Sequence, residues 1–120
     1  MGIAREEKQK RMELMVKNWQ FFDAPHVAFI SMPKTMKEVN AIDIGIYLQS
    51  LMLLFVEHGI SSCPQGALAF YPDPIIEKVG LPDDHGILCG ISFGYEDEGA
   101  QINNVKMPRA DLKECVSFFS

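Results

Sequence analysis

The pattern of hydrophobic and polar positions near the start of the chain predicts a helix and then a strand. From Ile3 to Trp19, apolar residues recur at the i, i+3, i+4, i+7 spacing of an amphipathic helix, and charged residues fill the positions between them. The helix should end before Pro25, because the residue that precedes a proline is pushed out of helical geometry. A short apolar strand follows from His26 to Met32 and stops at Pro33.

The longest apolar segment predicts a helix that is covered on every side. Asp43 suits the N-cap, and Gly59 suits the position just beyond the last turn. Apolar residues between them occupy almost every face, and such a helix must be buried all round. One folded layer of a 120-residue chain can hardly do this. We therefore expect a second subunit, or chain absent from this sequence, to cover part of the helix. The alternative is the central core helix of a compact monomer.

The middle of the chain predicts a turn and a short helix. Ser61 to Gly66 is polar and contains a proline and a glycine, which favours a turn. Asp73 and Pro74 then open a helix that runs through Val79, since proline is well tolerated in the first helical turn. Gly80 closes it.

The last third predicts a strand, an arm and a final helix. Gly86 to Tyr95 is an apolar strand, in which Gly90 and Gly94 indicate a bulge or a close backbone approach. Residues 96–108 include few apolar side chains and predict an extended surface arm. Residues 110–119 predict a short helix that begins near Ala110 or Asp111.

Composition narrows the class of protein. A chain of 120 residues is one domain, residues 1–120, or part of one, and 48% hydrophobic with 22% charged residues is typical of a globular protein. The net charge of −5 gives no electrostatic reason to expect nucleic acid or an anionic membrane. The apolar run Ile44 to Val56 is shorter than the ~20 residues of a membrane span. Met1 to Arg11 is charged and lacks the apolar core of a signal peptide. We expect a soluble cytoplasmic protein that does not bind a membrane.

The cysteines suggest no special chemistry. Cys63, Cys89 and Cys115 form no CxxC pair, and their spacing relative to the histidines does not resemble a zinc site. We expect buried, reduced thiols and no bound metal. The alternative, a catalytic thiol, has no histidine near it in the sequence.

Four short stretches, taken in their order, resemble the FMN-dependent nitroreductase family. They are similar to the FxAP lead into a central strand, the start of the long dimer-interface helix, the turn that lines the flavin ring, and the closing strand with its basic tail. In this chain they are Phe21–Pro25, Asp43–Leu53, Gly59–Gly66, and Ile91–Tyr95 with Asn103 and Pro108–Ala110.

The resemblance implies an α+β fold with the three-layer α/β/α arrangement of nitroreductases, present in part. Family members begin with an Arg/Ser-rich stretch on an early helix, which holds the phosphate and ribityl chain of FMN. No such stretch precedes Met1. The resemblance thus implies the C-terminal half of a family member, with the N-terminal part missing.

Two groups of residues are candidates for FMN binding. The resemblance assigns Gln65 and Gly66 to the N5 and O4 side of the flavin ring, with Pro64 shaping the turn, and glycine allows the backbone to come close. It assigns Lys106 and Arg109 to the phosphate, and the guanidinium fork of Arg109 suits phosphate oxygens better. The alternatives are an ordinary loop-to-helix turn and a solvated pair of surface cations.

The resemblance implies an FMN-dependent NAD(P)H oxidoreductase that acts as a homodimer. It would reduce small molecules such as nitroaromatics, quinones or similar acceptors by two-step hydride transfer through FMN, with no catalytic side chain. Two alternatives stay open at this point. One is a non-catalytic, truncated flavin-binding or dimerising fragment of such an enzyme, and the other is a small interaction module unrelated to flavin.

Overall fold

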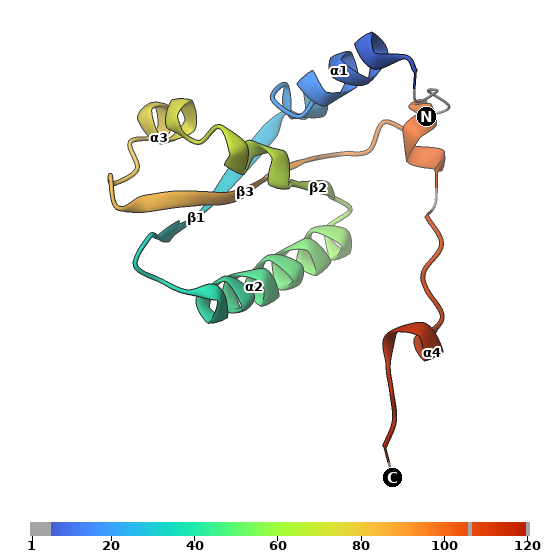
Figure 1. Ribbon diagram of the computed structural model, residues 1–120. Coiled ribbons are helices and arrows are strands. Elements are labelled where there is room, and N and C mark those ends of the chain that lie inside the picture. Colours follow the sequence, from blue (N-terminus) through green and yellow to red (C-terminus); the bar gives the residue numbers. More distant parts are fainter. Residues whose placement is uncertain (1–5, 106, 120) are drawn as a thin grey trace.

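A three-stranded antiparallel sheet forms the centre of the computed structural model, which describes residues 6–105 and 107–119. Its strands are β1 (His26–Pro33), β2 (Ser61–Gln65) and β3 (His85–Gly94), in the order β1-β3-β2. β3 is central because it pairs with both of the others. The helix α2 (Glu38–Glu57) lies along one face of the sheet, while the shorter α3 (Asp73–Val79) lies on the other (Figure 1). This is the predicted α+β fold with α/β/α layers.

The core sits where the short helices meet β3. Leu68, on the 3-10 helix η2 (Gly66–Phe70), is 1% exposed, and Ile91 at the middle of β3 is fully buried. A Cβ at Gly90 would lie only 2.3 Å from Leu68 Cδ1, and one at Gly94 would lie 2.8 Å from Pro25 Cδ. The predicted close approaches at both glycines are therefore confirmed. The irregularity in the ladder falls elsewhere, where Ile30 pairs with Cys89 but Ser31 with Ile87.

The helix α2 begins earlier than the sequence suggested. Its N-cap is Lys37, whose backbone N–H donates to Asn40 Oδ1 over 3.1 Å, so the prediction of Asp43 as the cap is wrong. Residues 38–42 continue the apolar periodicity, and Asp43 lies on an exposed helical surface. The predicted end is confirmed: Gly59 has φ +69°, and the Ile60 N–H donates to the Phe55 carbonyl over 2.8 Å.

The helix in the N-terminal arm is shorter than predicted. α1 spans Lys8–Val16, and residues 17–20 form turns instead of its last turn. No residue of α1 is buried, so the expected apolar stripe has no cover in this chain. The 3-10 turn η1 (Phe21–Asp23) then leads into β1. Residues 3–5 of the predicted helix lie outside the described residues.

The predicted polar turn at residues 61–66 is wrong for all but its last residue. Residues 61–65 form β2, because they pair with β3 in register, with Cys63 opposite Ser92 and Gln65 opposite Gly90. β2 is an edge strand, which is the position in a sheet where a proline such as Pro64 is tolerated. Sequence periodicity missed this strand because its side chains are mostly polar or exposed.

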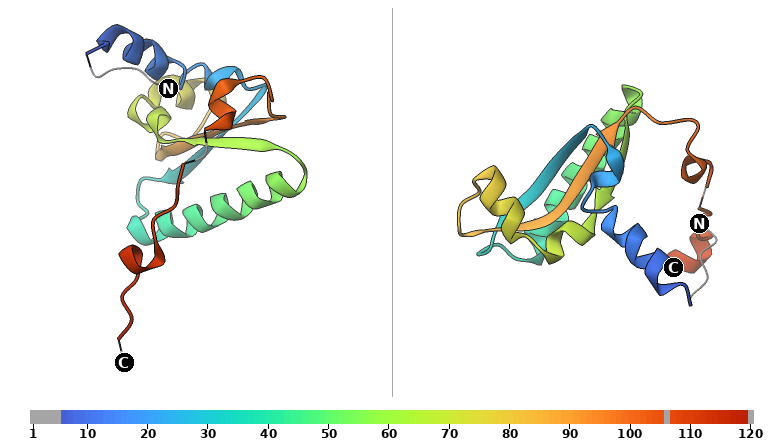
Figure 2. Two further views of the ribbon diagram at one scale, coloured as in Figure 1. Left: turned by 90° about the vertical axis from the view of Figure 1, so that its right-hand side faces the viewer. Right: turned by 90° about the horizontal axis from the view of Figure 1, so that it is seen from above.

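The C-terminal arm leaves the sheet and runs outward (Figures 1 and 2). It contains the 3-10 turn η3 (Gln101–Asn104) and a single helical turn, α4 (Leu112–Cys115). α4 begins near Asp111, as expected. Asp111 is its N-cap, and its Oδ1 accepts from the Lys113 N–H over 3.0 Å. The predicted helix to residue 119 is too long. Phe118 and Phe119 are 81% and 94% exposed, so no packing holds further turns.

The chain exposes much more surface than a compact monomer of its size. Its accessible area is 9853 Å², whereas a compact protein of 13.5 kDa exposes about 6,500 Å². The radius of gyration is 17.1 Å, against about 14 Å for a compact domain of this length. No residue of α2 is buried. The central core helix of a compact monomer is therefore excluded, because much of the apolar surface of α2 is uncovered here.

The length of α2 also changes the membrane argument. The helix has 20 residues, and an 18-residue stretch of it has a mean hydropathy of 1.7, which is long and apolar enough to cross a bilayer. The expectation that this segment is too short to span is therefore wrong. Length and composition are weak grounds for a span, because core helices meet the same criterion. α2 also packs on the sheet, where Phe55 stacks on Phe93 with ring centroids 4.9 Å apart.

Candidate functional site

Pro64, Gln65 and Gly66 lie where β2 ends and η2 begins. The backbone turns off the sheet edge here, so the three residues combine a regular strand end with an exposed bend. Gln65 is only 2% exposed, whereas Pro64 and Gly66 on either side are exposed. The structure therefore presents the backbone of this segment outward and buries one side chain behind it.

The Gln65 side chain is buried, and both ends of its amide are hydrogen-bonded inside the protein. Its Nε2 donates to the Asn18 carbonyl over 2.8 Å, and its Oε1 accepts a hydrogen bond from Ser92 Oγ. Ser92 is itself 3% exposed. Because both ends of the amide are engaged, any contact from Gln65 to a ligand has to come from its backbone.

Gly66 faces open space. A Cβ built at this residue would meet no atom within 4 Å, in contrast to Gly90, where a Cβ would strike Leu68. The open face at Gly66 lets a flat ligand lie directly against the backbone. This is the geometric property that the sequence expectation required of the turn.

An apolar cleft of about 250 Å³ lies on the same face of the sheet as Leu68. Two edge-to-face aromatic pairs frame it: Phe21 with Phe29, at 6.0 Å between ring centroids, and Trp19 with Tyr71, at 5.8 Å. Its lining is almost entirely apolar and comes from Trp19, Phe21, Phe29, Leu68, Pro74, Ile75, Lys78 and Val79. No pattern in the sequence indicated this cleft, because the lining residues come from four separate segments.

The predicted phosphate-binding pair is only partly visible. Lys106 lies outside the described residues, and Arg109 is exposed on the C-terminal arm. The arm on which Arg109 lies, between η3 and α4, leads away from the sheet and from β2 (Figure 1). The two halves of the predicted site are separate within a single chain.

The thiols differ from expectation. Cys63 and Cys115 are exposed, Cys89 is half-buried, and all three are free, so the prediction of buried thiols is wrong. Cys63 lies on the edge strand, and Cys115 lies on the arm, where nothing covers it. Partial burial raises the pKa of the Cys63 and Cys89 thiols, which keeps them protonated at neutral pH. Among the described residues no cluster of three metal-ligating side chains occurs.

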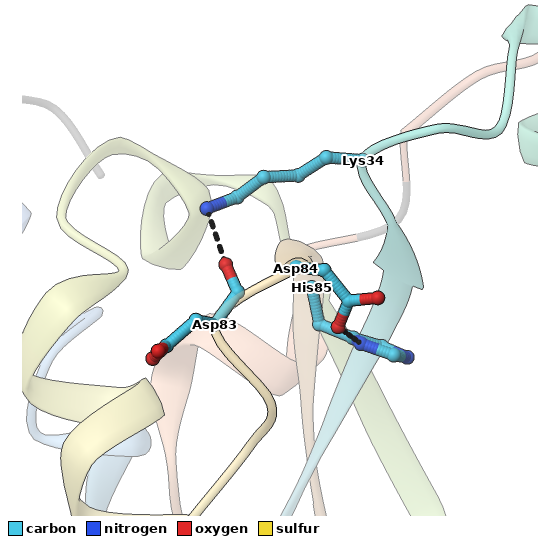
Figure 3. A network of polar contacts seen from close by, with 4 residues as sticks. All are labelled: Lys34, Asp83, Asp84 and His85. Atoms are coloured by element: carbon cyan, nitrogen blue, oxygen red, sulfur yellow. Dashed lines mark hydrogen bonds and ion pairs between the residues drawn. The ribbon is translucent and has the colours of Figure 1, made fainter.

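A polar network ties the far end of the sheet to the loop after α3 (Figure 3). Lys34 Nζ donates to the Asp83 carbonyl over 2.9 Å, and the Lys34 N–H donates to the Asp84 carbonyl over 2.7 Å. His85 Nδ1 and Asp84 Oδ1 are 2.9 Å apart. The hydrogen bond from His85 lowers the pKa of the exposed Asp84 carboxyl. These contacts fix the loop.

Comparison with known proteins decides the family. A model of the nitroreductase family matches residues 2–95, which include the whole sheet and both helical layers. The chain belongs to the nitroreductase family.

Two curated relatives and one crystal structure illustrate the similarity. Nitroreductase NfnB of Mycolicibacterium smegmatis is 42% identical over 118 residues, which are 98% of this chain and 50% of the relative. A 4-nitrobenzoate reductase of Pseudomonas putida is 38% identical over 92 residues, which are 77% of this chain and 40% of the relative. The crystal structure of FMN-dependent NfnB from Mycobacterium smegmatis in complex with NADPH superposes with a TM-score of 0.93 and 41% identity, and covers 99% of this chain and 53% of that one.

The nitroreductase fold is thus present in this chain as a part. The chain spans about half the length of the curated relatives that it matches. Within that part, sequence reasoning singled out the Pro64–Gly66 segment, which stays a prediction, and it missed Ser92 and Asn18 behind the segment. A weak signal for Ser92 existed, since it is a hydroxyl residue in an otherwise apolar strand. Asn18 contributes only its carbonyl, which no residue pattern reveals.

Proposed function

We propose that this chain forms part of an FMN-dependent NAD(P)H oxidoreductase of nitroreductase type. The acceptors would be nitroaromatics, quinones or similar small molecules. Family membership supports this, as do relatives described as a nitroreductase, a 4-nitrobenzoate reductase and an FMN-dependent enzyme in complex with NADPH. The observation that carries the proposal is the open backbone face at Gly66, at the segment that resembles the flavin-lining turn.

The residues of this segment fit a flat aromatic ring. Pro64 fixes the backbone torsion at the strand end, Gln65 is held from behind by two hydrogen bonds, and Gly66 has no side chain to keep a ring at a distance. FMN, when bound, would supply the hydride relay between NAD(P)H and the acceptor. The role of the chain would be to bind and orient the ring, and no side chain would act as a nucleophile or general base.

The phosphate side of FMN needs cations that the turn does not supply. Arg109, together with Lys106, would provide the charge. Because the arm that bears Arg109 points away from the turn, one chain does not complete the site. A site assembled from two chains, or from further chain, resolves this separation.

We also propose that a second copy covers α2, so that the assembly is a homodimer. Exposed apolar side chains occur on every part of the helix, including Val39 at 69%, Ile46 at 63% and Leu53 at 61%. A stable interface needs about 800 Å² from each partner. The surface excess over a compact monomer is several times that area, and it belongs to the whole chain, including the two arms as well as α2. Burial of apolar area at roughly 25 cal/mol per Å² would favour association strongly.

A binding titration tests the flavin proposal. Gly66→Ala adds a methyl group where a ring would lie, and nothing in the chain opposes that group, so folding should be unchanged. We expect FMN affinity to fall by about tenfold or more, equal to about 1.4 kcal/mol. Gly86→Ala is the matched control, because its added Cβ would meet only Lys34 Cγ, at 3.9 Å. Equal FMN affinity in the two variants, or no FMN binding by the wild-type chain, would overturn the proposal.

Turnover separates the enzyme from its alternative. Oxidation of NADPH in the presence of FMN and a nitroaromatic supports the oxidoreductase. Tight FMN binding without such oxidation identifies the chain as a non-catalytic flavin-binding or dimerising fragment. The half-length match to the curated relatives is the observation that keeps this alternative in view.

The mass in solution tests the dimer. Ile46→Glu places a charge on the exposed face of α2 and should convert a dimer to a monomer without unfolding the sheet. Tyr95→Glu, at a residue 84% exposed beyond β3, is the matched control and should stay dimeric. A wild-type chain that is monomeric by light scattering at high concentration would refute the dimer.

A further inference from the structure

Two buried polar side chains connect the sheet to the N-terminal arm. Ser92 and Gln65 are 3% and 2% exposed, and they are the buried polar residues within the described ranges 6–105 and 107–119. Ser92 Oγ on the central strand donates to Gln65 Oε1 on the edge strand. Gln65 Nε2 in turn donates to the Asn18 carbonyl, 2.8 Å away and 47 residues distant in the sequence. The chain of contacts thus runs across three separate segments.

The direction of these hydrogen bonds is fixed by chemistry. The Asn18 carbonyl only accepts, so the Gln65 amide must turn its NH₂ group toward it. The Gln65 Oε1 therefore faces Ser92, whose hydroxyl is free to rotate and donate. One orientation of the Gln65 side chain satisfies both partners, whereas the reverse orientation would set Oε1 against the Asn18 carbonyl and leave both of these acceptors without a donor. The network consequently holds Gln65 in a single rotamer.

The far end of the network is a strained segment. Asn18 lies in the turns that precede Phe21, Phe22 and Asp23, which have φ of +54°, +53° and +61°. Residues other than glycine adopt three such left-handed conformations in a row only when their surroundings hold them. The Gln65–Asn18 hydrogen bond is one such restraint, and the Phe21–Phe29 ring contact is another. The near end of the network is the residue next to Gly66.

We infer that the Gln65 side chain is a positioning group, which couples the backbone at Gly66 to the left-handed turn of the N-terminal arm through Ser92 and Asn18. The inference rests on the proposed function for the identity of the ligand at Gly66. The coupling itself does not depend on the proposed function. A buried amide costs stability unless it is fully bonded, and a bonded one specifies a single geometry. An apolar residue of similar size would fill the same space without fixing the turn.

Backbone hydrogen exchange tests the coupling in the chain without any ligand. Ser92→Ala removes the hydrogen bond to Gln65. Gln65→Met removes both hydrogen bonds and keeps an unbranched side chain of similar length. Each variant should raise exchange about tenfold or more at residues 64–67 and 17–24, since a lost buried hydrogen bond favours local opening. Ser62→Ala is the matched control. It is the same substitution as Ser92→Ala, and it lies on β2, the strand that carries Gln65, at the residue that pairs with Phe93. It should leave both segments unchanged.

The pattern of exchange distinguishes positioning from general support. A rise at both segments, with α3 and the middle of β1 unchanged, supports the coupling. A uniform rise across the described residues would mean that the side chains only stabilise the fold, and it would overturn the inference. No rise at residues 17–24 in either variant would also overturn it.

A flavin measurement separates this inference from the proposed function. Where the wild-type chain binds FMN, Gln65→Met should shift the absorption or midpoint potential of the bound flavin, because the Gly66 backbone is displaced, while FMN binding is retained. An unchanged flavin spectrum and potential would show that the side chain does not position the ligand. If no FMN binds to the wild-type chain, the proposed function fails, whereas the exchange pattern still decides the coupling.

Discussion

The contact between Gly90 and Leu68 gives the sharpest stability prediction. In Gly90→Ala the new Cβ would lie 2.3 Å from Leu68 Cδ1 and 3.6 Å from both Leu68 Cγ and the Ala28 carbonyl oxygen. Carbon atoms in contact are about 3.5–4.0 Å apart, so Leu68 would have to withdraw by over ~1 Å. Leu68 is 1% exposed and lies two residues after Gly66, so its displacement would move η2 and with it the candidate flavin turn.

The expected cost follows from overpacking. Forcing extra carbon into a well-packed site destabilises by about 1–3 kcal/mol, and total stabilities are about 5–15 kcal/mol. Gly86→Ala is the control on the same strand, where the nearest atom to the new Cβ is 3.9 Å away. It should be neutral or slightly stabilising, because alanine loses less backbone entropy than glycine on folding. The difference between the two variants measures the clash.

Urea unfolding provides the assay. With a slope of about 1–3 kcal/mol per molar urea, the loss should lower the midpoint of Gly90→Ala by roughly 1 M with the slope unchanged. Leu68→Ala alone should cost about 2–5 kcal/mol, and the double variant should cost less than the sum, because the smaller side chain makes room for the methyl group. Equal midpoints for Gly90→Ala and Gly86→Ala, or a strictly additive double variant, would refute the packing argument.

Three further predictions concern charge and protonation. Arg109→Ala should weaken FMN retention with little change in the urea midpoint, because the residue is exposed; unchanged retention would remove Arg109 from the site. Burial raises the pKa of Cys63 and Cys89, so alkylation of these thiols should be slow at pH 7 and accelerate above about pH 9. The stability that the protonated thiols contribute should fall over the same range, and fast labelling at pH 7 would contradict this. The hydrogen bond from His85 lowers the pKa of Asp84, so that contact should persist above about pH 4 and be lost as the pH falls further. Asp84→Asn should abolish this acid-sensitive step in amide exchange near residue 85, and an unchanged step would reject the assignment.

The sequence by itself determined the elements whose rules are local. β1 and β3 were placed to within one residue at each end, because their apolar runs are bounded by Pro33 and by polar segments. The ends of two helices were found from Gly59 and Gly80, both of which have positive φ. The start of the last helix near Asp111 was found in the same way. Each of these signals depends on neighbouring residues alone, so no knowledge of the fold was needed.

Only the tertiary structure decided the features that depend on distant partners. β2 is a strand because its backbone pairs in register with β3, although its own polar sequence favours a turn. The exposure of α2 reflects what surrounds it and not its composition. The prediction for Gln65 changed most. Its side chain bonds to Asn18 and Ser92, which are far away in the sequence. Only its backbone is left to face a ligand. A buried amide must find partners wherever the fold places them, and a sequence pattern does not record that placement.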